Sequence, residues 1–390
     1  MKEYKYLIVG GGITAAFAVQ GIREKDKDGS IAILTKENYA PYSRPPLSKD
    51  LWKGKPVESI WLPVPEENVD ILTNHTVMQL TLAAKKVLTQ NKQEFGFQTL
   101  LLATGSDSKR LRFSDDDIIY YRNFSDYLKL SDLAEKRNDF AVIGAGFIGS
   151  EIAAALAMKR KKVFLLESGA GIGWKIFPQA IVEFLNALYR SKGVEVLDHT
   201  LIKDIEKQGE RHHVMLKNGK TMPVDGVISG VGVKPNSLLA DKAGIYVEDG
   251  IKVNSYLETS SPDIFAAGDV AAFHSSALDK TLRIEHNDNA KKMGYLAGLN
   301  MAGGNEEYDY LPMFYSDLFD IGYEAVGLID VRLDPKVVWK EEFKRGVIYY
   351  RKDNVIKGIL LWNEWDKVDL AREIIMKQKW IADDDLIKLI

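Results

Sequence analysis

Residues 139–167 read DFAVIGAGFIGSEIAAALAMKRKKVFLLE, and residues 4–35 read YKYLIVGGGITAAFAVQGIREKDKDGSIAILT. Each stretch contains a short apolar strand, a glycine-rich turn, an apolar helix with a charged end, and a second apolar strand. This order predicts a βαβ unit with a right-handed crossover and a buried parallel sheet. Because the pattern occurs twice, the sequence predicts an α/β protein with two Rossmann-like nucleotide-binding domains.

The glycine turns indicate what these domains bind. The spacing G-x-G-x-x-G/A falls on Gly10, Gly12 and Ala15, and again on Gly144, Gly146 and Gly149. The first glycine permits a tight turn, the second lets the backbone approach a pyrophosphate, and the third small residue lets helix and strand pack closely. Free N–H groups at the start of the helix then face the phosphates. We therefore expect two dinucleotide sites.

The acidic residue after the second strand distinguishes between dinucleotides. Glu167 ends the strand of the second unit, where a carboxylate can accept from an adenosine ribose 2′-hydroxyl. No arginine follows at 168–170 to meet a 2′-phosphate, so this unit favours NADH over NADPH. In the first unit the acid comes later, after Thr35 and Lys36. We expect Glu37 to bind the other ribose.

The composition excludes several kinds of chemistry. The chain has 390 residues, a net charge of −3 and no cysteine. It therefore has no disulfide, no thiol relay and no cysteine-bound metal, and we expect no metal site. The charge balance gives no signature of nucleic-acid binding, and no apolar run is long enough to span a bilayer. Residues 1–19 resemble a secretory signal, but three glycines interrupt the apolar stretch, so we expect a cytoplasmic protein.

Further patterns outline the rest of the chain. Residues 85–104 and 212–230 each predict a hairpin followed by a buried strand, in equivalent places after the two βαβ units. After residue 313 the pattern changes to hairpin-like strands and a helix at 366–379, which indicates a small α+β domain. We interpret residues 331–346 as a turn between strands of that domain.

Several motifs resemble one family. They are PYSRPPLSKDLW (41–52), LLLATGS (100–106), IFAAGDV (264–270), RIEHNDNA (283–290), MFYSDLFDIGYEAVGLID (313–330) and residues 346–375. In this order they resemble the apoptosis-inducing factor-like flavoproteins, in the ferredoxin-reductase-like branch of the pyridine nucleotide–disulfide oxidoreductases. The resemblance implies a discontinuous FAD domain (1–108 and 234–312), an NADH domain (109–233) and a C-terminal domain (313–390).

The resemblance also implies site residues. Besides the first glycine turn and Glu37, the expected FAD contacts are Arg44, Lys49, Ala103, Thr104, Gly105, Arg122, Gly268, Asp269, His286 and Asn287. Besides the second glycine turn and Glu167, the expected nicotinamide-side contacts are Phe147, Ile148, Glu151, Lys175, Gly232, Glu285, Tyr315 and Glu324. Lys49 and Glu151 are expected to pair near flavin N5, and Phe147 to cover the flavin face. His286 is the one histidine in its motif, where it could assist proton transfer or serve the structure.

Three functions fit these residues. The leading interpretation is an FAD-dependent NADH oxidoreductase that transfers a hydride to flavin N5. Without cysteine, electrons must then pass directly to an external acceptor such as oxygen, a quinone or a protein. The second interpretation is a ferredoxin or rubredoxin reductase, which needs a basic patch near the flavin. The third is a slow redox sensor, in which a long-lived reduced flavin–NAD charge-transfer complex changes the protein surface or its homodimerisation.

Overall fold

The computed structural model describes residues 1–113 and 117–390, which form two compact units. Unit 1 comprises Met1–Arg44, Val57–Asp107 and Lys234–Met313, and unit 2 comprises Pro45–Pro56, Ser108–Val233 and Phe314–Ile390. Two short strands, β7 (Ser106–Ser108) and β16 (Val233–Pro235), contain two of the points where the chain passes between the units. The C-terminal segment falls in the same unit as the second glycine turn. The division into an FAD domain, an NADH domain and a C-terminal domain stays a prediction.

Unit 1 is built on one mixed sheet with the strand order β3-β2-β1-β6-β5-β4, and β19 pairs with β6. These strands are β1 (Lys2–Val9), β2 (Ile31–Leu34), β3 (Val69–Leu72), β4 (Val77–Thr81), β5 (Lys86–Thr89), β6 (Glu94–Leu102) and β19 (Ile264–Ala266). β1 runs parallel to β2 and β6, whereas β5 and β6 form an antiparallel pair. The first βαβ unit and the first hairpin are therefore confirmed.

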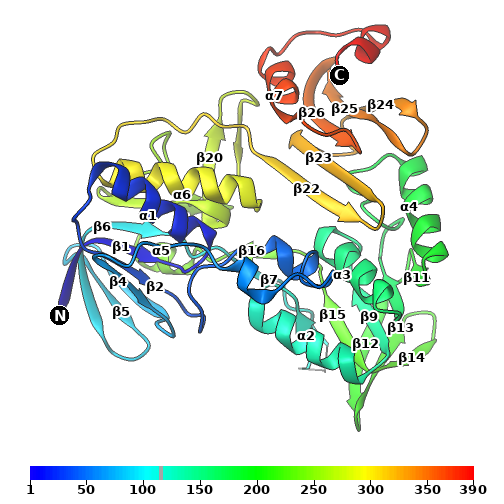
Figure 1. Ribbon diagram of the computed structural model, residues 1–390, viewed down its shortest axis with the longest axis horizontal. Coiled ribbons are helices and arrows are strands. Elements are labelled where there is room, and N and C mark those ends of the chain that lie inside the picture. Colours follow the sequence, from blue (N-terminus) through cyan, green and yellow to red (C-terminus); the bar gives the residue numbers. More distant parts are fainter. Residues whose placement is uncertain (114–116) are drawn as a thin grey trace. The chain divides into compact units, whose positions relative to one another are not determined.

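Two helices pack side by side on this sheet, α1 (Ile13–Lys25) and α6 (Asn287–Met301) (Figure 1). Glycines set their separation, because a Cβ on Gly298 would lie 2.0 Å from the Ala18 carbonyl oxygen. The remaining elements of unit 1 are α5 (Leu238–Lys242), β17 (Val247–Glu248), β18 (Gly250–Lys252), β20 (Ala271–Ser275), β21 (Lys280–Leu282), and the 3₁₀ turns η2 (Val57–Ile60) and η3 (Gly268–Val270). The close packing of these two helices fixes the start of α1 at the carboxyl end of β1.

Unit 2 contains a parallel sheet with the order β11-β10-β9-β15-β8 and an antiparallel sheet with the order β12-β13-β14. Their strands are β8 (Ile119–Tyr120), β9 (Asp139–Ile143), β10 (Lys162–Leu166), β11 (Val194–Leu197), β12 (Ile202–Gln208), β13 (Arg211–Leu216), β14 (Thr221–Val224) and β15 (Gly226–Ser229). The helices are α2 (Phe124–Lys136), α3 (Phe147–Met158) and α4 (Gln179–Ser191), and η1 is the turn Pro45–Ser48. The second βαβ unit and the second hairpin are confirmed.

The C-terminal part of unit 2 is an antiparallel sheet with the order β22-β23-β26-β25-β24, covered by α7 (Val368–Met376) (Figure 1). Its strands are β22 (Met313–Leu318), β23 (Ile321–Gly327), β24 (Asp334–Glu341), β25 (Arg345–Lys352) and β26 (Val355–Trp362), and η4 (Asp383–Lys388) follows the helix. Aromatic rings join this sheet to the segment before α4, where Phe177 meets Tyr323 and Trp362 edge to face at 5.4 and 5.6 Å. The C-terminal sheet is thereby packed, through β23 and β26, against the segment that precedes α4.

The interpretation of residues 331–346 as a turn is wrong. Half of this segment is the edge strand β24, which pairs antiparallel with β25, and the reversal between the two strands is confined to residues 342–344. Val337, Val338 and Trp339 favour an extended backbone, and Pro335 is tolerated because an edge strand leaves N–H groups unpaired. No helix in the described parts of the chain is long and apolar enough to cross a membrane.

Candidate functional site

The first glycine turn lies between β1 and α1 in unit 1. Gly10 has a φ of +122°, and a Cβ there would lie 2.0 Å from the Ala103 carbonyl oxygen. The turn therefore packs directly on the end of β6, where the predicted residues Thr104 and Gly105 follow. Gly12 caps α1, and a Cβ on it would meet nothing within 4 Å. Open space beside the start of a helix is the arrangement that accommodates a pyrophosphate.

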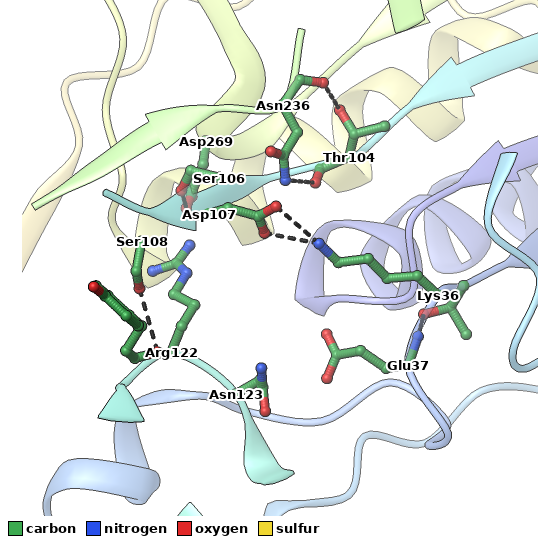
Figure 2. Close-up of polar contacts among 12 residues, drawn as sticks. Lys36, Glu37, Thr104, Ser106, Asp107, Ser108, Arg122, Asn123, Asn236 and Asp269 are labelled. Carbon is green, nitrogen blue, oxygen red and sulfur yellow. Dashed lines mark hydrogen bonds and ion pairs between the residues drawn. The ribbon is translucent and has the colours of Figure 1, made fainter. Parts of the chain in front are cut away.

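The acid of the first unit is held by side chains. The Glu37 carboxylate accepts from Arg44 Nη2 at 2.6 Å and from the Tyr42 hydroxyl at 2.5 Å. Burial alone raises the pKa of Glu37, but the charge of Arg44 and the hydrogen bonds from Tyr42 and Arg44 outweigh it and lower the pKa. Lys36 instead bonds Asp107 at 2.8 Å (Figure 2). Two predicted residues, Glu37 and Arg44, thus form one charge-paired site.

The motifs ATG and GD meet at the ends of their strands. Ser106, which follows the ATG motif, donates its hydroxyl to the Asp269 carboxylate at 2.8 Å. Gly268 has a φ of +78°, and a Cβ there would lie 2.4 Å from Thr14 Oγ1 on α1. Asn236 was not predicted, yet it exchanges two hydrogen bonds with Thr104 (Figure 2). Its position before a short helix gives no sequence signal of this role.

His286 caps α6 in unit 1, directly before Asn287. Burial lowers the pKa of the His286 imidazole to about 4, although the carboxylates of Asp269 and Asp288 act in the opposite direction. The ring is therefore neutral at pH 7, and does not carry the proton that an acid catalyst would donate. Glu285 accepts a hydrogen bond from Arg283, which belongs to the RIEHNDNA motif but was not predicted as a site residue.

The second glycine turn lies between β9 and α3 in unit 2. Gly144 has a φ of +90°, and a Cβ on Gly149 would lie 1.8 Å from its carbonyl oxygen. Only glycine fits at this third position. Gly146 caps α3, is exposed, and has nothing within 4 Å of a Cβ built on it. Phe147 and Ile148, both half-buried, begin the helix.

Glu167 turns back onto this glycine turn. One carboxylate oxygen accepts from the Ala145 N–H at 2.8 Å, and the other accepts from the Gly169 N–H at 2.9 Å. The second oxygen also accepts from the Ser168 hydroxyl at 3.0 Å and from the Trp174 indole N–H at 3.2 Å. Trp174 was not predicted, because a single tryptophan in a loop carries no motif.

Lys49 and Glu151 form a buried ion pair in unit 2. The ammonium lies 2.6 Å from one carboxylate oxygen, and the side chains are 11% and 2% exposed. The hydroxyls of Ser48 and Ser316 donate to the same carboxylate at 2.5 and 2.6 Å. The pair was predicted from the family resemblance, whereas the two serines were missed. η1, α3 and β22 therefore meet at one charged group, which satisfies its acceptors in a dry environment.

Aromatic rings surround this pair. Phe147 at the start of α3 meets Phe314 edge to face at 5.2 Å. Tyr315, the next residue, is 40% exposed, and the Lys49 ammonium lies 5.2 Å from its ring centroid. Burial, aided by the charges of Asp317 and Glu151, raises the pKa of Tyr315 to about 12, so the phenol stays protonated. The Lys49 ammonium, two phenylalanine rings and a tyrosine ring thus lie close to the second glycine turn.

The remaining predicted residues lie outside this group. In unit 2, Lys175 is exposed beside Trp174, Gly232 accepts from the Lys109 N–H, and Arg122 precedes α2. Glu324 on β23 has one buried oxygen without a hydrogen bond among the described residues, and burial, reinforced by Asp366, raises its pKa. Their roles in binding stay predictions.

Comparisons with known proteins cover almost the whole chain. A sequence profile of pyridine nucleotide-disulphide oxidoreductases matches residues 4–294. A second profile, of the C-terminal part of mitochondrion-associated apoptosis-inducing factor, matches residues 297–341 and 334–377. The profiles coincide with the nucleotide-binding pattern and with the C-terminal sheet.

Individual relatives are similarly extensive. Apoptosis-inducing factor 1 of Dictyostelium discoideum is 31% identical over 98% of this chain and 80% of its own. Monodehydroascorbate reductase 3 of Arabidopsis thaliana is 30% identical over 92% of this chain and 89% of its own. The structure of a covalent putidaredoxin reductase–putidaredoxin complex matches with a TM-score of 0.91 and 25% identity, covering 100% of this chain and 98% of the other.

Proposed function

This chain belongs to the pyridine nucleotide-disulphide oxidoreductase family and is a flavin-dependent NAD(P)H oxidoreductase. From that premise we propose that it oxidises NADH with FAD and passes the electrons directly to an external acceptor. The observation that carries the proposal is the buried Lys49–Glu151 pair beside the second glycine turn. The pair places a fixed positive charge near a nucleotide-binding turn. Because the chain has no cysteine, no thiol relay stands between flavin and acceptor.

Unit 1 has donors and space that fit FAD. The open side of Gly12 would receive the pyrophosphate, and the Glu37 carboxylate would accept from the ribose while Arg44 balances its charge. Asp269, held by Ser106, would accept from the ribityl hydroxyls. Bound FAD would supply the redox centre that accepts a hydride and releases electrons. The residues themselves bind and orient.

Unit 2 has donors and space that fit NADH. Gly146 leaves the start of α3 open to a pyrophosphate, and the fixed Glu167 carboxylate would accept from the adenosine ribose. A 2′-phosphate would meet the negative charge of that carboxylate. This supports NADH as the preferred donor.

The side chains around Lys49 then act by position and charge. The Lys49 ammonium would stabilise the negative charge that the cofactor gains, and Glu151 keeps that ammonium in place. Phe147 would cover the reacting face and exclude water until the nicotinamide arrives. His286, neutral at pH 7, would contribute a hydrogen bond and not an acidic proton. Orientation and electrostatics suffice for hydride transfer, which needs no general acid.

The relatives suggest two kinds of acceptor and one alternative role. The putidaredoxin complex favours a small electron-transfer protein, and the monodehydroascorbate reductases favour a small oxidant. The alternative role is a slow redox sensor that changes its homodimerisation, which remains our second proposal for a relative of apoptosis-inducing factor 1. The cytoplasm remains our expected location.

Anaerobic mixing with NADH tests the proposal. The purified protein should be yellow, its flavin should bleach faster with NADH than with NADPH, and Lys49→Met should slow that bleaching. Oxygen, a quinone, monodehydroascorbate or a ferredoxin is then added. Rapid return of the oxidised spectrum identifies the acceptor class of an enzyme. A long-wavelength band that survives in air, with a shift in elution volume, identifies the sensor. Folded protein without flavin would contradict both.

A further inference from the structure

The loop after β10 is held in place by hydrogen bonds from two other elements of unit 2. Its residues 169–175 contact both the glycine turn and α4. The Gly173 N–H donates to the Ala145 carbonyl at 3.0 Å, inside the glycine turn. Asn186, buried on α4, accepts from the Ile172 N–H at 3.1 Å and donates to the Ala170 carbonyl at 2.8 Å. These bonds hold the loop against the turn that would receive the pyrophosphate.

Trp174 closes this loop onto Glu167. Its indole N–H donates to the carboxylate, and its ring lies directly against Gly169. A Cβ built on Gly169 would lie 2.3 to 2.7 Å from three atoms of the indole, so only glycine permits this contact. Trp174 is still 36% exposed, and the Lys175 ammonium lies 5.3 Å from its ring centroid. One side of the indole is thus packed, while part of the ring remains available.

Three donors near the ribose acid are committed to that acid. The Ser168 hydroxyl and the N–H groups of Gly169 and Trp174 point to one Glu167 oxygen. A phosphate is an acceptor and needs such donors, whereas a ribose hydroxyl can donate to a carboxylate. A dinucleotide with a 2′-phosphate would therefore meet a negative charge and donors that are already used. A dinucleotide with a free 2′-hydroxyl would meet an oriented acceptor.

We propose that Trp174 is a specificity-determining residue, whose indole positions Glu167 and withholds donors from a 2′-phosphate, so that the site selects NAD over NADP. The inference rests on the proposed function, because it assumes that unit 2 binds the nicotinamide dinucleotide. It adds a residue that neither the glycine motif nor the strand-end acid identifies. Trp174 acts through Glu167 and takes no part in hydride transfer.

Isothermal titration of the flavin-loaded protein with NAD⁺ and NADP⁺ tests the proposal without turnover. Trp174→Phe keeps a ring but removes the N–H, and should lower the NAD⁺/NADP⁺ affinity ratio about tenfold. Gly169→Ala keeps the indole but displaces it, and should change the ratio in the same direction. Trp380→Phe, at a 65% exposed tryptophan in the same unit, is the matched control and should leave the ratio unchanged. Thermal unfolding checks that each variant is folded.

Fluorescence adds a readout that a purely structural residue would not change. NADH should quench tryptophan emission in the wild type and in Trp380→Phe, and quench it less in Trp174→Phe. If the wild type prefers NAD⁺ but both Trp174→Phe and Gly169→Ala keep its affinity ratio, the role of Trp174 is wrong and the proposed function stands. If the wild type binds neither nucleotide, the proposed function fails as well.

Discussion

The two glycine turns share a sequence pattern but differ in where the backbone is crowded. In unit 1 the closest approach is at the first glycine, where a Cβ on Gly10 would lie 2.0 Å from the Ala103 oxygen. In unit 2 it is at the third, where a Cβ on Gly149 would lie 1.8 Å from the Gly144 oxygen. Ala15 occupies the third position of unit 1 without difficulty. The same motif therefore tolerates different substitutions in its two copies.

The acids of the two turns are also stabilised differently. Glu37 is paired with the charge of Arg44, whereas Glu167 accepts mainly from backbone N–H groups and from Trp174. An arginine balances charge and remains a donor for a nearby phosphate, but committed N–H groups do not. We therefore expect the two proposed nucleotide sites to differ in selectivity.

A third difference lies on the helices. Two residues after the third small residue, α1 has Phe17 and α3 has Glu151. Phe17 is half-buried near Lys291, whereas Glu151 is buried and receives Lys49 and two serine hydroxyls. Equivalent helical positions thus hold an apolar side chain in unit 1 and a charged side chain in unit 2.

The largest expected effect on stability comes from removing the charge of Glu151. Glu151→Gln leaves the Lys49 ammonium buried without its counter-charge, and should lower the free energy of unfolding by about 3–5 kcal/mol. Phe17→Leu, at the equivalent position, should cost less than about 1.5 kcal/mol. Chemical denaturation at pH 7 measures both. Equal losses would show that the two helical positions are equivalent.

The double variant Lys49→Met/Glu151→Leu sharpens this test. Removing both charges should restore most of the stability lost in Glu151→Gln, because no buried charge is left unpaired. Reduction of the flavin by NADH, followed by stopped-flow absorbance, should stay slow. Recovery of both stability and rate would remove the ion pair from the proposed mechanism.

The third positions of the glycine motifs should give the next largest difference. Gly149→Ala forces a Cβ against the Gly144 oxygen, and should destabilise unit 2 by about 2–3 kcal/mol. Ala15→Gly should destabilise unit 1 by about 1 kcal/mol, through backbone entropy in a helix. Thermal unfolding compares the stabilities of the two variants, and titration measures their NAD⁺ binding. A stable Gly149→Ala variant with normal NAD⁺ binding would contradict the crowding at this position.

Acid should weaken the pair that Glu37 forms with Arg44. The folded-state pKa of Glu37 lies below its ordinary value of 4.5, so its stabilising contribution is complete above that pH and is lost as pH falls through the folded pKa. Glu37→Gln should therefore cost about 1–2 kcal/mol at pH 7, and the difference from wild type should shrink below pH 4.5. Urea denaturation between pH 3.5 and 7 measures this difference in stability. A difference that is constant with pH would contradict the ionic pairing with Arg44.

The smallest effects on stability are expected at the open glycines. Gly12→Ala and Gly146→Ala place a methyl group in free space, and each should cost less than about 1 kcal/mol. Their effects on ligands should differ in kind, because Gly12→Ala should lose flavin and Gly146→Ala should weaken NAD⁺ binding. Flavin content by absorbance and NAD⁺ titration measure each. Unchanged binding in both variants would argue against pyrophosphate at these turns.

Much of the fold could be predicted because it is local. The βαβ units, both hairpins and the C-terminal helix follow from periodicity and turn residues within short windows. β24 could not be predicted in this way, because it is an edge strand that its pairing with β25 defines. The residues Ser48, Ser316, Asn236 and Trp174 were missed for a similar reason, since each gains its role from a partner distant in sequence or from a loop without a motif.

The sequence by itself determined the two glycine turns, the acids at the strand ends and the absence of thiol chemistry, because these depend on residue type and short spacing. It did not determine how each acid is held. Only the tertiary structure joined Arg44 to Glu37, two serines to Glu151, and Trp174 to Glu167. The physical reason is that a buried carboxylate takes its donors from whichever segments the fold brings within hydrogen-bond distance.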